Sequence, residues 1–127
     1  MWGIDNRTAA IRVLNESPDA TRCELRVCGG DIHIHIALAA YLAAGLDGIR
    51  KGTDPGEAAS GDLDEQSVAR LPDDWGKALD AFDSSSWVKE AFGKEFCRNY
   101  STVKRFEYEN FRRTVPETER KTYIEFL

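Results

Sequence analysis

The chain has 127 residues, of which 42% are hydrophobic, and its formal net charge at pH 7 is -5. This length suits one domain with a hydrophobic core. The acidic balance argues against a general nucleic-acid binder, which needs a basic surface. The three cysteines, Cys23, Cys28 and Cys97, form no CxxC pair. They predict reduced thiols in a cytoplasmic protein rather than a disulfide framework or a zinc site.

The sequence contains no pattern typical of membrane insertion or secretion. Asp5 and Arg7 interrupt the N-terminus before an apolar run forms, so we expect no signal peptide. The longest apolar run, residues 36–46, is well short of the ~20 residues that span a bilayer. It predicts a buried helix.

A β-hairpin is expected near the N-terminus. Residues 1–14 contain the polar segment Asp5-Asn6-Arg7 near their start. They continue into a strand on which Ala9, Ile11 and Val13 share a face. Residues 15–21 (NESPDAT) have the composition of a turn. A second strand follows at residues 22–28. An isolated hairpin is only marginally stable in water, so this one must pack on helices or join a larger sheet.

The rest of the chain is predicted to be helical, apart from one loop. Asp31 is the expected N-cap of a buried, alanine-rich helix over residues 32–51. Residues 52–70 are rich in glycine and acids and predict a surface loop. Further helices are expected to start at residues 71–74, at Ser84–Ser86, near Lys94 and at Pro116. Their aromatic side chains are expected to form core: Trp75, Phe82, Trp87, Phe92, Phe96, Tyr100, Phe106, Phe111, Tyr123 and Phe126. The expected fold is a single α+β domain, mainly helical.

The charged face of the second strand is the first candidate site. Side chains alternate along a strand, so Arg22, Glu24 and Arg26 share one face. Arginine binds phosphate and carboxylate in a bidentate manner, and a carboxylate can hold a hard divalent cation. Arg7 and Arg12 would join the same small sheet if the strands pair, and such a cluster favours a bound anion. The alternative is a solvated strand face whose charges neutralise one another.

Two other clusters are candidate sites. His33 and His35 share a face if the backbone there is extended and could then bind a transition metal, but no third ligand is identifiable. The alternative is that they are ordinary residues at the start of a helix. The acidic segment Asp62–Glu65 is expected to be a solvated loop. The sequence contains no GxSxG, Walker A, GxGxxG or HExxH motif.

Several segments together resemble the C-terminal catalytic segment of glutamine synthetases. They are NRTAAIRV at residues 6–13, RCELRV at 22–27 and ALAAYLAAGLDGI at 37–49, in the family's order and spacing. The tail is similar as well, with LPDDWGKALDAF, EAFGKEF and YENFRRTVPETERKTYIEFL. The resemblance is greatest to the branch that includes γ-glutamylpolyamine synthetases.

This resemblance implies an activity and a set of site residues. The family uses ATP to phosphorylate the γ-carboxylate of glutamate, and ammonia or an amine then attacks the γ-glutamyl phosphate. Two divalent cations, Mg²⁺ or Mn²⁺, neutralise the phosphates. The matching positions imply catalytic roles for Arg7 and Arg26, ATP-phosphate contacts for Arg12 and Arg22, and metal ligation by Glu24. Neither nucleic acid nor a membrane is an expected partner.

The sequence also departs from the family pattern. Family members carry a β-grasp domain and most of a catalytic barrel ahead of this segment, and His33-Ile34-His35 replaces a common N-P-Y. A single glutamate cannot hold two metal ions. We therefore expect the chain alone not to be a competent ligase. Because exposed strand edges tend to find partners, we expect a homo-oligomer formed through residues 6–28. The alternatives to an enzyme fragment are a non-catalytic module that associates with itself or with a full-length relative, and an anion- or nucleotide-binding domain without chemistry.

Overall fold

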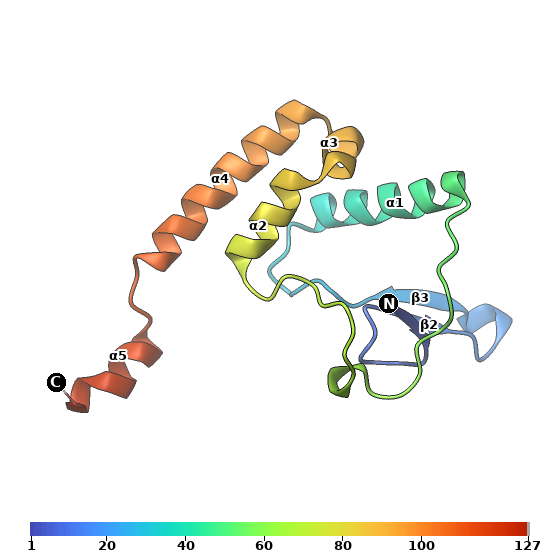
Figure 1. The fold of residues 1–127 in the computed structure, drawn as a ribbon, viewed down its shortest axis with the longest axis horizontal. Helices are drawn as coiled ribbons and strands as arrows, with labels where there is room; N and C mark the ends of the chain where they lie inside the picture. Colours follow the sequence, from blue (N-terminus) through green and yellow to red (C-terminus); the bar gives the residue numbers. More distant parts are fainter. Residues whose placement is uncertain (127) are drawn as a thin grey trace. The chain divides into compact units, whose positions relative to one another are not determined.

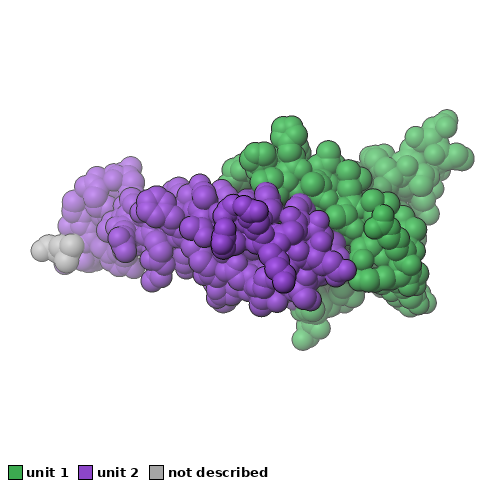
Figure 2. Space-filling view, turned by 90° about the horizontal axis from the view of Figure 1, so that it is seen from above, with its two compact units in different colours: residues 1–69 green, residues 70–127 purple. Residues whose placement is uncertain are grey.

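The computed structural model describes residues 1–126 and forms two compact units. Unit 1 comprises residues 1–69 and unit 2 residues 70–127, shown in green and purple in Figure 2. Unit 1 contains three strands and one long helix, and unit 2 contains four helices. The predicted α+β, mainly helical class is confirmed. In the described part of the chain no helix is long and apolar enough to cross a membrane.

Unit 1 is built on a three-stranded sheet in the order β1-β2-β3 (Figure 1). The antiparallel pair of β2 (Ile11–Leu14) and β3 (Arg22–Leu25) is the predicted hairpin. Its connection contains a short 3-10 turn, Pro18–Ala20, whose N-cap Ser17 accepts a hydrogen bond from the Ala20 amide. Strand β1 (Trp2–Ile4) runs parallel to β2 and was not predicted.

The register of the hairpin gives the sheet two different faces. Arg12 lies opposite Glu24, and both point to the same face as Arg22, because side chains alternate along each strand. On the other face Ile11 lies opposite Leu25 and Val13 opposite Cys23. This second face is apolar, yet Ile11, Cys23 and Leu25 are exposed.

The segment predicted as a free surface loop, residues 52–70, is partly anchored to the start of the sheet. The Ala59 amide donates to the Trp2 carbonyl oxygen at 2.8 Å, and the Leu63 amide donates to Thr8 Oγ1 at 3.0 Å. Leu63 begins a 3-10 turn (Leu63–Glu65) and is buried, as is Ala9. Asp62 caps that turn through the Asp64 amide, so part of the acidic segment has a local structural role.

The alanine-rich helix is present, but the prediction that it is buried is wrong. Helix α1 (Ile34–Lys51) contains no buried residue. One stripe, made up of Ile34, Leu38, Leu42, Leu46 and Ile49, is between 50% and 79% exposed. The predicted N-cap is wrong too, because His33 takes that position, without a side-chain capping bond. The helix ends at Gly52, whose left-handed backbone (φ 59°) suits glycine.

Unit 2 follows the predicted helices closely. They are α2 (Trp75–Ser84), α3 (Ser86–Phe92), α4 (Lys94–Arg112) and α5 (Glu117–Tyr123), followed by a 3-10 turn at Ile124–Phe126. Asp74 caps α2 by accepting from the Lys77 amide, and Ser85 caps α3 by accepting from the Val88 amide.

The predicted aromatic core of unit 2 is only partly correct. Phe82 packs on Tyr100 with ring centroids 5.3 Å apart, and Leu79 and Cys97 are buried between α2, α3 and α4. Phe106, Phe111, Tyr123 and Phe126, however, are more than half exposed. Phe111 still contacts Trp75 of α2, with ring centroids 5.7 Å apart, so the periodic pattern predicts a contact between helices but not how deeply it is buried.

Candidate functional site

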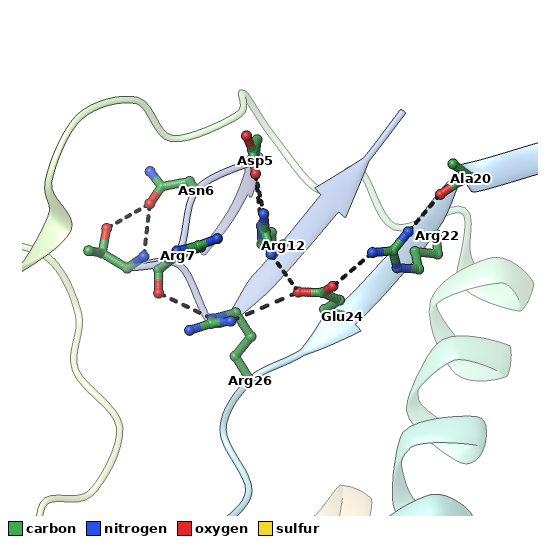
Figure 3. A network of polar contacts seen from close by, with 9 residues as sticks. Asp5, Asn6, Arg7, Arg12, Ala20, Arg22, Glu24 and Arg26 are labelled. Carbon is green, nitrogen blue, oxygen red and sulfur yellow. Dashed lines mark hydrogen bonds and ion pairs between the residues drawn. The ribbon is translucent and has the colours of Figure 1, made fainter. Parts of the chain in front are cut away.

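The charged face of the sheet in unit 1 forms a continuous ion-pair cluster centred on Arg12 (Figure 3). Only 14% of the Arg12 side chain is exposed. Its Nη1 donates to Glu24 Oε2 at 3.0 Å, across the hairpin. Its Nε and Nη2 both donate to Asp5 Oδ1. Arg12 therefore links the loop after β1 to strand β3.

Glu24 is shared by three arginines. Besides Arg12, Arg22 Nη2 donates to Glu24 Oε1 at 3.4 Å, and Arg26 Nη1 lies 3.9 Å from Glu24 Oε2. The alternation of β3 produces this arrangement, because it puts Arg22, Glu24 and Arg26 on one face and the register brings Arg12 opposite the carboxylate. The predicted grouping of these four residues is thus present.

Arg7 is placed differently from the other arginines. It lies in the turn between β1 and β2, where its carbonyl oxygen accepts a hydrogen bond from Arg26 Nε at 3.1 Å. Within residues 1–126 its exposed guanidinium forms no ion pair. Arg7 is therefore a cation near the cluster that remains available to a ligand.

The charges of the cluster do not balance. Four guanidinium groups (Arg7, Arg12, Arg22, Arg26) face two carboxylates, Asp5 and Glu24, which leaves two positive charges in excess. The hydrogen bond from Arg12 lowers the pKa of Glu24 below its ordinary 4.5, and that of Asp5 below its ordinary 3.8. Both carboxylates are accordingly ionised at neutral pH.

A hollow adjoins this cluster beside Arg7. It has a volume of about 610 Å³ and lies between residues 4–7 and residues 58–61. Asn6 joins its two walls, because Asn6 Nδ2 donates to the Gly61 carbonyl oxygen at 2.9 Å. Asn6 Oδ1 accepts from the Thr8 hydroxyl, which itself accepts from the Leu63 amide. Asn6 and Thr8 thus act as positioning residues, and Arg7 lies between them.

The chemistry of this face suits an oxyanion. Guanidinium groups bind phosphate and carboxylate oxygens through paired N–H donors, and an excess of positive charge attracts an anionic ligand. A divalent cation fits less well. Both oxygens of Glu24 are engaged by arginines, and the described residues contain no group of three side chains able to hold a metal ion. Glu24 could supply one ligand only if other carboxylates came from elsewhere.

The other predicted cluster remains a pair. The rings of His33 and His35 lie with centroids 5.7 Å apart at the start of α1, and no third ligand joins them in residues 1–126.

Tyr41 of α1 contacts a cysteine that precedes the helix. Its hydroxyl lies 2.6 Å from Cys28 Sγ. Partial burial together with this contact raises the pKa of Tyr41 to about 12.

One member of the cluster, Asp5, is not predicted by the sequence pattern. In the sequence it is only part of a polar segment, yet its Oδ1 accepts hydrogen bonds from two nitrogens of Arg12. Its backbone is left-handed (φ 46°), a conformation that aspartate adopts more readily than most residues. The sequence signal for Asp5 is its position: an acidic residue directly before the NRT motif.

Comparison with known proteins gives the family of this chain. The family model for the catalytic domain of glutamine synthetase matches residues 1–123. The chain belongs to the glutamine synthetase catalytic-domain family. It is 34% identical to a glutamine synthetase of Halobacterium salinarum and 35% identical to type-1 glutamine synthetase 2 of Dictyostelium discoideum, over 98% and 99% of its own length. It is also 33% identical, over 98% of its length, to a gamma-glutamylethanolamide synthetase of Streptomyces coelicolor.

The chain spans only a part of these relatives. It covers 29%, 25% and 27% of their lengths, in the order given. The catalytic-domain family is therefore established for this segment, whereas the activity of a whole ligase is a property of much longer proteins.

Proposed function

We propose that this chain supplies the phosphate-binding arginines of a glutamine synthetase-like, ATP-dependent carboxylate–amine ligase. The observation that carries the proposal is the cross-strand cluster of Arg12, Glu24, Arg22 and Arg26, with the unpaired Arg7 beside it. The cluster lies within the segment that matches the glutamine synthetase catalytic domain. Catalysis of phosphoryl transfer rests largely on positioning and on stabilising charge on phosphoryl oxygens, which is what fixed guanidinium groups provide.

Each residue has a proposed role. Arg12 and Arg22 contact ATP phosphates, Arg7 contacts the transferring phosphoryl group, and Arg26 lies at the carboxylate substrate. Glu24 supplies one ligand to Mg²⁺ or Mn²⁺. The free guanidinium of Arg7 and its place beside a hollow support its role, because it can bind an anion without first losing an internal ion pair.

The substrates follow from the family. They are ATP, glutamate, and ammonia or an amine. The similarity to a gamma-glutamylethanolamide synthetase supports an organic amine, as in the γ-glutamylpolyamine branch. We propose a role in nitrogen metabolism in the cytoplasm, within a homo-oligomer. Both units belong, in this proposal, to one catalytic domain whose β-grasp part and most of whose barrel lie outside these residues.

We propose that the 127 residues alone do not turn over substrate. The described residues offer one carboxylate at the centre of the cluster, whereas Mg²⁺ requires six ligands in near-octahedral geometry. The alternative function is a non-catalytic module that associates with itself or with a full-length relative. The large apolar side chains exposed on α1 and on the sheet favour that alternative.

Isothermal titration of the chain with ATP and Mg²⁺ tests the proposal. We expect saturable binding, weakened roughly tenfold by Arg7→Ala, because a charge-assisted hydrogen bond contributes about 1.5–3 kcal/mol. Arg50→Ala, at an exposed arginine near the end of α1, is the matched control and should bind like the original chain. Absence of binding by a folded chain, or equal losses in both variants, would contradict the proposal and leave the non-catalytic module.

A further inference from the structure

The segment formed by residues 59–63 packs directly against the first strand. The Ala59 amide donates to the Trp2 carbonyl oxygen at 2.8 Å. A Cβ atom at position 3 would lie 2.8 Å from the Ala59 carbonyl oxygen, so this close approach requires glycine, and Gly3 is buried. The backbone of the segment is therefore held beside the turn that follows β1.

The hydroxyl of Thr8 joins this segment to the same turn. Thr8 Oγ1 accepts a hydrogen bond from the Leu63 amide at 3.0 Å and donates one to Asn6 Oδ1 at 2.7 Å. Asn6 completes the connection, because its Oδ1 also accepts from the Thr8 amide and its Nδ2 donates to the Gly61 carbonyl oxygen. A hydroxyl can donate and accept at one atom, whereas a valine side chain of the same shape can do neither.

Arg7 lies between Asn6 and Thr8 and depends on them for its position. Its carbonyl oxygen accepts from Arg26 Nε at 3.1 Å (Figure 3). In the described part of the chain no ion pair holds its exposed guanidinium. The position of that guanidinium is thus set through the backbone. A cationic side chain that must first be ordered binds an anion more weakly than one already in place, because ordering costs free energy.

We propose that residues 59–63 control the affinity of Arg7 for phosphate oxygens, and that Thr8 is the positioning residue that connects them. The phosphate ligand rests on the proposed function, whereas the connection rests on the hydrogen bonds of Thr8. Coupling between two sites is reciprocal, so a bound phosphate group should in turn hold residues 59–63 in place. A purely structural Thr8 would instead affect the stability of unit 1 and leave the affinity of the folded chain unchanged.

Titration with inorganic pyrophosphate tests the coupling at Thr8. Pyrophosphate supplies phosphate oxygens without a base or a sugar. We expect Thr8→Val to bind it about tenfold more weakly, and Thr8→Ser, which keeps the hydroxyl, to bind within about threefold of the original chain. Thr102→Val, which removes an exposed hydroxyl from α4, is the matched control and should bind like the original chain. Equal affinities of the folded Thr8→Val variant and of the original chain would overturn the proposal.

Variants at Leu63 test the same connection from the side of the segment. Leu63→Pro removes the amide N–H that donates to Thr8, whereas Leu63→Ala keeps it, and both shorten the buried side chain. Proline suits this position, because Leu63 begins a 3-10 turn and the preceding Asp62 has an extended backbone (φ -79°, ψ 113°). We expect pyrophosphate to bind about tenfold more weakly to the proline variant than to the alanine variant. The proposal is wrong if the two variants bind equally.

Amide hydrogen exchange separates this proposal from the proposed function. Without any ligand, the Thr8 amide should exchange about tenfold faster in Leu63→Pro than in Leu63→Ala, and equal rates would overturn the connection. With pyrophosphate at about ten times its Kd, the Leu63 amide of the original chain should exchange about tenfold more slowly. The same concentration should slow it only about twofold in Arg7→Ala, which binds about tenfold more weakly. If the original chain binds no pyrophosphate, the proposed function and this inference both fail, whereas binding without protection of the Leu63 amide refutes the inference alone.

Discussion

Arg12 and Arg7 belong to one motif, but the structure gives them different tasks. Arg12 bonds to carboxylates on two separate segments, whereas Arg7 makes no side-chain ion pair in residues 1–126. We therefore expect Arg12→Ala to lower the urea midpoint of unit 1, because it leaves Glu24 and Asp5 without their main partner. Arg7→Ala should leave the midpoint unchanged. The fluorescence of Trp2 would report the unfolding of unit 1 in urea. The other two tryptophans are replaced by phenylalanine for this measurement. Equal midpoints for both variants would contradict this assignment.

The same ion pairs predict how stability depends on pH. The pKa of Glu24 is lower in the fold than its ordinary 4.5, chiefly because Arg12 donates to it. The unfolded chain therefore binds the proton more tightly, and the contribution of Glu24 is present above pH 4.5 and lost as pH falls through the lowered pKa. We expect the melting temperature of the chain to fall below about pH 4.5.

The Glu24→Gln variant is the control for this pH dependence. Glutamine keeps the size of the side chain but cannot ionise, so the variant should be less stable at pH 7 and should lose less stability on acidification. Asp5 also titrates in this range, since Arg12 lowers its pKa as well, and some dependence should therefore persist. An unchanged pH profile in Glu24→Gln would contradict the role of this carboxylate.

Residue patterns explain why much of the cluster could be predicted. Strict alternation puts Arg22, Glu24 and Arg26 on one face in any strand, and the hairpin then brings Arg12 across from Glu24. Asp5 could not be predicted in this way, because it reaches Arg12 through a left-handed backbone turn rather than through a periodic pattern. The role of the 52–70 loop as an anchor also depends on long-range contacts, such as that of Leu63 with Thr8.

Helix α1 illustrates what a single element's sequence cannot specify. Its apolar run correctly predicts a helix, but burial requires a second surface, and in the described residues none covers the stripe from Ile34 to Ile49. The opposite side of the helix, which includes Ala40, is half-buried. The apolar pattern of α1 therefore predicts the helix but not the surface that packs on it.

This difference between the sides of α1 leads to a prediction. The double variant Leu38→Lys, Leu42→Lys should fold with unchanged melting temperature, because both side chains are more than half exposed and lysine favours a helix. It should also bind less apolar dye and associate less at high concentration. Ala40→Lys, on the half-buried side, is the matched control and should lower the melting temperature. A large loss of stability in the double variant would mean that the stripe is covered in solution.

At the scale of the whole molecule, the chain exposes more surface than its mass requires. Its accessible area is 10198 Å², whereas a compact monomer of 14.3 kDa exposes about 6,800 Å² and two separate compact domains of half that mass about 8,200 Å². The apolar residues that are buried are few: Ala9, Leu14, Leu63, Leu79 and Cys97. The exposed stripe of α1 is one part of this additional surface.

This surplus of surface sets an expected heat-capacity change. On unfolding, this chain should newly expose roughly three-quarters of the area that a compact domain of the same length newly exposes. The heat-capacity change of unfolding should therefore be about 1.3 rather than about 1.7 kcal/mol/K. Scanning calorimetry of the chain at low concentration, with its mass checked by sedimentation, measures this. A heat-capacity change near about 1.7 kcal/mol/K for a monomer would contradict the large exposed area of the folded chain. The same value for a larger species would mean that association covers the exposed surface.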